Sequence, residues 1–152
     1  MAKTYLFATI LAVLVLVLSC SQVENKPSGA ILNPVNPNGD SELALLMRAM
    51  FDDGVNMKAQ IKEGRIPESI LEYEKIHTAS ATEPEKAASA EFKAYSEQFL
   101  SIVKKLKTSD EGQVEHFYTQ LVHSCMGCHQ AMCPGPMVKI KKMYLDYDLA
   151  DD

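Results

Sequence analysis

Two long stretches of the sequence carry apolar or small residues at alternating spacings of four and three, which restricts the fold more than any other feature. Residues three and four apart share one face of an α-helix, so each stretch predicts a helix with a continuous seam. Seams of this spacing are typical of helices that pack nearly parallel to their neighbours. The seam positions are Leu43, Met47, Met50, Gly54, Met57 and Ile61 in one stretch, and Ala88, Phe92, Tyr95, Phe99, Ile102 and Leu106 in the other.

The residues next to the first stretch predict its ends and a shorter helix after it. Asp40 or Ser41 can cap the first helix, and Gly64 can end it. Proline is accepted in a first helical turn, so a second helix is expected to begin near Pro67. Its apolar positions are Ile70, Tyr73 and either Ile76 or His77.

Two capping boxes predict the starts of a third and a fourth helix. Thr82 with Glu85 precedes the second seam, and Thr108 with Glu111 precedes a further apolar stripe. The segment 134–136, Pro-Gly-Pro, stops the fourth helix. The fourth stripe consists of Val114, Phe117, Leu121, Cys125, Cys128 and Met132, and a short amphipathic tail from Met137 to Leu145 follows it.

The pattern predicts an all-α protein, with an antiparallel four-helix bundle over residues 40–133 and a C-terminal extension over 134–152. Short connections between helices favour antiparallel neighbours. The chain has no tryptophan and only 7% aromatic residues, which argues against a β-sandwich or barrel.

The N-terminus has the layout of a secretory signal over residues 1–19. Lys3 supplies a positive charge, and the apolar or small run from Leu6 to Leu18 is shorter than the roughly 20 residues that a membrane-spanning helix needs. The ending Val-Leu-Ser-Cys at 17–20 resembles the lipobox of bacterial lipoproteins, which implies a lipid anchor on Cys20. The alternatives are an uncleaved anchor or a signal cut elsewhere. Residues 20–39, rich in proline, glycine and asparagine, are then the anchor and a flexible tether.

These features place the protein in the bacterial cell envelope, facing the periplasm and held to a membrane by lipid. Ser21 after the cysteine favours the outer membrane over the inner one. The net charge of −5, with no basic tract, argues against nucleic-acid binding.

Cys125, Cys128 and His129 form a C-x-x-C-H motif on the fourth helix. This is the attachment signature of c-type haem. Two thiols one helical turn apart can each bond a porphyrin vinyl group, and the adjacent imidazole can bind iron as the proximal ligand. The motif and the export signal together predict one covalent haem c, because this haem is attached outside the cytoplasm.

Three other interpretations of the cysteines remain open. A redox dithiol would require a βαβ context, and no strand is visible. A zinc site could use Cys125, Cys128 and Cys133 with His123 or His129, although these ligands crowd one helix. The chain could also be a structural lipoprotein with two incidental buried cysteines.

A late C-x-x-C-H motif on the last of four helices, after a first helix rich in methionine, resembles the class II cytochromes c, the cytochrome c′ and c-556 group. The resemblance covers about residues 41–133. It implies that the haem is attached to the last helix. The break at 133–136 departs from the family pattern, in which the last helix runs on past the motif, and the short helix expected after it follows from the amphipathic tail. In this family the second axial position is either a first-helix methionine or open to small gases.

The segment 50–54 resembles the low-spin pattern of that family, a methionine four residues before a glycine. Met50 is therefore the expected distal ligand. Gly54, one turn on, would let a flat macrocycle approach the backbone. Met47 is the alternative, followed by Met57. A distal histidine from His77, His116 or His123 is a further option, and Cys133 is expected to be a free thiol.

The sequence thus predicts a membrane-tethered electron carrier and not an enzyme, since no nucleophile or acid–base pair is evident. Its expected partners are redox proteins that dock transiently, and some members of the family form homodimers. The alternatives are a gas-binding or gas-sensing high-spin haem protein and a non-haem metal-binding or structural lipoprotein.

Overall fold

The computed structural model describes residues 41–147, and all the secondary-structure elements assigned within them are helices. The expected all-α class is therefore confirmed for this part of the chain. The predicted signal, the predicted lipid anchor at Cys20 and the predicted tether lie outside the described residues. The elements are α2 (Glu42–Lys62), η1 (Tyr73–His77), α3 (Pro84–Ala87), α4 (Ala90–Lys107), α5 (Val114–Met132) and α6 (Met137–Lys141).

Helix α2 begins and ends where the sequence predicts. The Ser41 hydroxyl accepts the backbone N–H of Ala44 at 3.2 Å, so Ser41 is the cap. Gly64 has φ +73°, the left-handed conformation that commonly follows a helix and favours glycine. The seam of α2 faces inward, because Met50, Gly54, Met57 and Ile61 are buried.

The predicted second helix is wrong over most of its length. Only Tyr73–His77 is helical, as the 3-10 helix η1, and Ile70 is fully exposed. The Gln60 side chain accepts the N–H of Glu68 at 3.1 Å, which connects this non-helical segment to α2. Five residues of the predicted helix remain helical, and two of them, Tyr73 and Ile76, are buried.

The third predicted helix is divided into two. The short α3 ends at Ala87, and α4 begins after Ser89, whose hydroxyl accepts the N–H of Phe92 at 3.1 Å. Thr82 does not cap a helix, because the N-cap of α3 is Glu83 and no side chain caps this helix. The Thr82 hydroxyl donates to Ser41 Oγ at 3.0 Å. The capping box at Thr82 and Glu85 is therefore a wrong prediction, although the seam from Phe92 to Leu106 is largely buried.

The capping box at Thr108 and Glu111 is also wrong. Thr108 ends α4, and its hydroxyl donates to the carbonyl oxygens of Lys104 and Lys105 at 3.0 and 3.3 Å. Helix α5 begins three residues after Glu111, without a side-chain cap. Its end is as predicted, because α5 stops at Met132 and the backbone of Cys133 is extended before Pro134.

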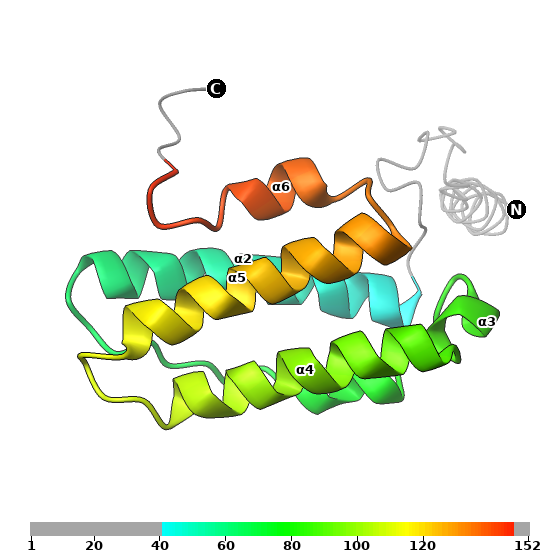
Figure 1. Ribbon diagram of the computed structural model, residues 1–152, viewed down its shortest axis with the longest axis horizontal. Helices are drawn as coiled ribbons and strands as arrows, with labels where there is room; N and C mark the ends of the chain where they lie inside the picture. Colours follow the sequence, from blue (N-terminus) through cyan, green and yellow to red (C-terminus); the bar gives the residue numbers. More distant parts are fainter. Residues whose placement is uncertain (1–40, 148–152) are drawn as a thin grey trace, which may run out of the picture. The chain divides into compact units, whose positions relative to one another are not determined.

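Helices α2, α4 and α5 are the three long elements, and α4 and α5 lie side by side along much of their lengths (Figure 1). Helix α6 packs on α5 on the side away from α4, and η1 packs against α2 and α4. The expected C-terminal extension thus contributes to the core, through Ile140 and Met143, which are 5% and 3% exposed. None of the helices described between residues 41 and 147 has the length and apolarity to span a membrane.

Candidate functional site

A largely apolar cavity lies among the three long helices, η1 and α6. The cavity itself measures about 60 Å³, and it lies in a region of about 640 Å³ that is free of protein atoms and extends into open solvent. Both cysteines of the C-x-x-C-H motif and its histidine line the cavity, together with Met47, Met50 and Met143.

Helix α5 places Cys125 and Cys128 on the cavity side, one turn apart. Both thiols are free and both residues are partly buried. Burial, followed by the neighbouring Cys128, raises the pKa of Cys125 to about 12. Burial, followed by Cys133 and Glu91, raises the pKa of Cys128 to about 11. Both groups are therefore protonated thiols at neutral pH.

His129 is the only histidine of the described residues that lines the cavity, and it is 9% exposed. Its Nδ1 lies 3.0 Å from the carbonyl oxygen of Cys133. A carbonyl oxygen can only accept, so Nδ1 carries the proton and Nε2 keeps its lone pair. Burial lowers the pKa of His129 against the opposing effect of this hydrogen bond. The ring is thus in the neutral form that binds metals.

The methionines of the cavity come from two distant parts of the chain. Met47 and Met50 are on α2, as expected, whereas Met57 is buried elsewhere. Met143 follows α6, and its side chain fills the space beside Gly54, where a Cβ would overlap Met143 Cε. In this structure Gly54 therefore leaves room for Met143, and the expected approach of a flat macrocycle at Gly54 stays a prediction.

Polar groups in the cavity wall are few and mostly satisfied. Tyr73 donates its hydroxyl to the carboxylate of Asp53, and burial is the main cause that raises the Tyr73 pKa far above its usual value. Ser96 donates to backbone oxygens of its own helix. Ser124 differs, because its Oγ is buried without a hydrogen-bond partner, alone among the side-chain nitrogens and oxygens of residues 41–147. A buried hydroxyl without a partner is costly.

The other candidate histidines are not among the residues that line the cavity. His77 contacts Ser96 Oγ at 3.5 Å, His116 pairs with Gln120 at 2.8 Å, and the His123 ring packs on Tyr144 with centroids 5.5 Å apart.

The ligands of the alternative zinc site are only partly brought together. The Cys133 thiol is free, and its Sγ lies 3.3 Å from His129 Nδ1. Within the part of the chain that the structure describes, however, no three residues of the His, Cys, Asp and Glu types come close enough to hold a metal ion.

Sequence reasoning missed the contributions of Met143 and Ser124. Met143 belongs to the amphipathic tail, whose pattern did not show which part of the chain it would contact. Ser124 precedes the motif and falls outside the apolar stripe, so only its burial without a partner marks it.

Comparisons with protein-family models, with curated proteins and with solved structures found no match for this chain.

Proposed function

We propose that this protein is a c-type cytochrome that carries one covalent haem and transfers single electrons. The observation that carries the proposal is the meeting of two thiols, a neutral imidazole and an apolar cavity on one face of α5. Haem c would supply one-electron redox chemistry at its iron. The finer fold assignment is part of the same proposal: a haem-bearing four-helix bundle of the class II cytochrome type in which η1 takes the place of a long second helix.

The residues of the cavity fit that cofactor. Cys125 and Cys128 would hold it through thioether bonds, and His129 would bind the iron through Nε2, since Nδ1 is engaged by a carbonyl. Aromatic and aliphatic side chains of α4, η1 and α5 would exclude water from its faces. The unpartnered hydroxyl of Ser124 offers a polar contact to a bound group.

Met50 is the proposed distal ligand. It is 9% exposed, lies on the seam of α2 and borders the same cavity as His129. A thioether ligand and a dry environment both raise the reduction potential of iron. Met47 and Met143 border the cavity as well and are the residues that would replace Met50 if it does not bind.

The location of the protein is a separate proposal that depends on the sequence of residues 1–39. A lipid on Cys20 would hold the domain at the periplasmic side of a bacterial membrane, the outer one being favoured, where it would dock redox proteins transiently. A Cys20→Ala variant should leave the membrane fraction. Retention of that variant in the membrane would contradict the anchor and leave the haem proposal untouched.

Haem staining after denaturing electrophoresis tests the cofactor. The wild type should stain, because only thioether-linked haem survives denaturation, and Cys125→Ala with Cys128→Ala should abolish the stain. Cys133→Ala is the matched control and should stain like the wild type. An unstained wild-type protein, or a stained double variant, would overturn the proposal.

Optical spectra distinguish electron transfer from gas binding. The reduced protein should give a sharp low-spin band that CO does not shift, and Met50→Ala should give a high-spin spectrum that CO does shift. Met57→Ala is the control, because Met57 is buried but does not border the cavity. A wild-type spectrum shifted by CO would favour the gas-binding alternative.

A further inference from the structure

The end of α5 lies next to the histidine of the motif. Cys133 is the first residue past the helix, with φ −159° and ψ 86°, and its carbonyl oxygen accepts His129 Nδ1–H at 3.0 Å. The backbone N–H of Cys133 still donates to the His129 carbonyl at 3.0 Å. Residues 129 and 133 are therefore joined twice, once through the helix ladder and once through the imidazole.

The carbonyl of Cys133 is available because the helix stops there. In a continuing helix this oxygen would accept the N–H of residue 137. Here the N–H of Met137 donates to the Pro134 carbonyl at 3.1 Å instead. Proline at 134 excludes the helical conformation for Cys133, so the carbonyl turns from the helix axis towards the imidazole.

We propose that the stop at Cys133 and Pro134 is the positioning device for His129, in that the Cys133 carbonyl fixes the imidazole plane and holds the proton on Nδ1. This inference rests on the proposed function of His129 as an iron ligand. Cys133, through its backbone, and Pro134 are thus positioning residues that touch the histidine and not the iron.

The hydrogen bond has a consequence for the iron. A metal-bound histidine that donates its second N–H to a carbonyl becomes a stronger electron donor. Stronger donation stabilises the more oxidised iron, so the Cys133 carbonyl lowers the reduction potential. The effect of the Cys133 carbonyl on the potential is thus opposite in sign to the effects of the apolar cavity and of a thioether ligand, both of which raise the potential.

The Cys133 thiol is a second group near the same nitrogen, with Sγ 3.3 Å from Nδ1. Sulfur is a weak acceptor, and the carbonyl is both closer and stronger. The carbonyl, not the thiol, is therefore assigned as the partner. Cys133→Ala separates the two, because it removes the sulfur and keeps the carbonyl.

The first measurement uses the reduced wild-type protein with its haem and ¹⁵N-labelled histidine. Hydrogen–deuterium exchange of the His129 Nδ1 proton should be roughly tenfold slower than in an imidazole without a partner. Exchange at the rate of an unprotected imidazole would overturn the proposal without any variant. An unstained wild-type protein would overturn the haem proposal instead, so the two failures are distinguishable.

The second measurement compares midpoint potentials of three variants. Pro134→Ala should let residue 133 become helical, turn its carbonyl away from His129 and raise the potential. Pro136→Ala, which keeps Pro134, and Cys133→Ala should both retain the wild-type potential. An unchanged potential in Pro134→Ala, or an equal rise in Cys133→Ala, would overturn the assignment of the carbonyl.

Discussion

The two halves of α5 share one helix and differ in almost everything else. The N-terminal half, Val114–Val122, which we call the anchor half, contains Tyr118, Leu121 and Val122, all at most 2% exposed. The C-terminal half, from residue 123 to Met132, which we call the motif half, carries partly exposed cysteines and borders the cavity.

The difference extends to the hydrogen bonds of the two halves. In the anchor half, the Tyr118 hydroxyl lies 2.8 Å from the carbonyl oxygens of both Gly54 and Met143, so it joins α5 to α2 and to the chain after α6. In the motif half, Ser124 Oγ has no partner. The anchor half therefore connects α5 to two other parts of the chain. The motif half instead leaves one buried hydroxyl without a partner at the cavity.

The largest expected effect is that of truncation in the anchor half. Leu121→Ala should lower the free energy of unfolding by about 2–5 kcal/mol, because it removes a side chain that is 2% exposed and enlarges the cavity that Leu121 borders. Gln130→Ala, at an exposed position of the motif half, should change it by less than about 0.5 kcal/mol. Denaturant unfolding of samples with equal haem content measures both, and equal losses would contradict the division of α5.

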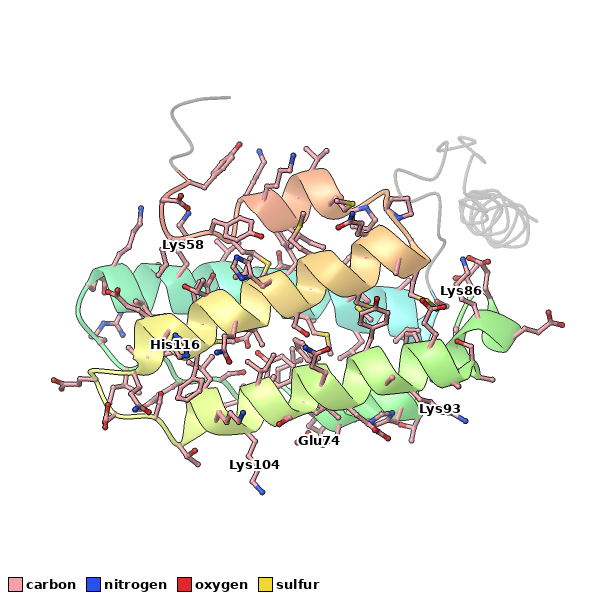
Figure 2. All side chains as sticks on the ribbon, in the orientation of Figure 1. Lys58, Glu74, Lys86, Lys93, Lys104 and His116 are labelled. Carbon is pink, nitrogen blue, oxygen red and sulfur yellow. The ribbon has the colours of Figure 1, made fainter. Side chains whose placement is uncertain are left out.

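The next largest effect concerns residues 142–147, which follow α6. Hydrogen bonds connect this segment both to Tyr118 of the anchor half and to Lys58 of α2. The Lys58 ammonium, 8% exposed, donates to the carbonyl oxygens of Lys142 and Tyr147 at 3.1 and 2.6 Å. Figure 2 labels this lysine beside the C-terminal segment. Lys58→Met should lower the free energy of unfolding by about 1.5–3 kcal/mol, because hydrogen bonds of charged groups are stronger than those between neutral groups.

Hydrogen exchange locates that loss. Amides of residues 140–147 should exchange faster in Lys58→Met, while those of the anchor half keep their protection. Lys104→Met, at an exposed position of α4, is the control and should match the wild type. Uniformly faster exchange would show that Lys58 supports the whole fold and not this segment.

A smaller effect is expected from the hydroxyl of the anchor half. Burial raises the pKa of Tyr118 above its usual value, so it remains a protonated donor. Tyr118→Phe should lower the free energy of unfolding by about 1–3 kcal/mol, because it removes the single buried O–H that the two carbonyl oxygens share. Tyr95→Phe is the matched control on α4. Thermal unfolding of both variants checks this, and equal shifts would refute the role of the Tyr118 hydroxyl.

The smallest effect lies far from α5, at the start of α2. Glu42 accepts the N–H and hydroxyl of Ser80 at 3.0 and 2.9 Å, and these bonds lower its pKa. A lowered folded-state pKa stabilises the fold above the unfolded-state pKa, and this gain is lost as pH falls through the lowered value. Thermal midpoints of the wild type and Glu42→Gln should differ slightly at about pH 7 and converge in acid. A difference between the two midpoints that grows as the pH falls would contradict the lowered pKa of Glu42.

Much of the fold follows from residues that are neighbours along the helices. The seam of α2, the Ser41 cap, the Gly64 ending and the stop before Pro134 are local features, and all four are present. Two of the wrong predictions concern segments that contact a distant part of the chain. The Gln60 side chain accepts the Glu68 N–H, and the Thr82 hydroxyl donates to Ser41 Oγ, and no local pattern shows either contact. The third, the capping box at Thr108, is wrong for a local reason, because Thr108 ends α4.

The candidate site divides in the same way. The spacing of Cys125, Cys128 and His129 placed all three at one cavity, because residues three and four apart share a helical face. The spacing could not show that Met143 would fill the space beside Gly54, or that the Cys133 carbonyl would meet the imidazole.

The sequence by itself determined the helical class, the seam of α2 and the group of thiols and imidazole on α5, since each depends on the 3.6-residue repeat of one helix. Only the tertiary structure decided which elements enclose the cavity and which side chain packs beside Gly54. These depend on contacts between residues 64 to 89 positions apart, such as Tyr118 with Gly54 and Lys58 with Tyr147. No local pattern encodes such contacts, because they form only when separate helices pack.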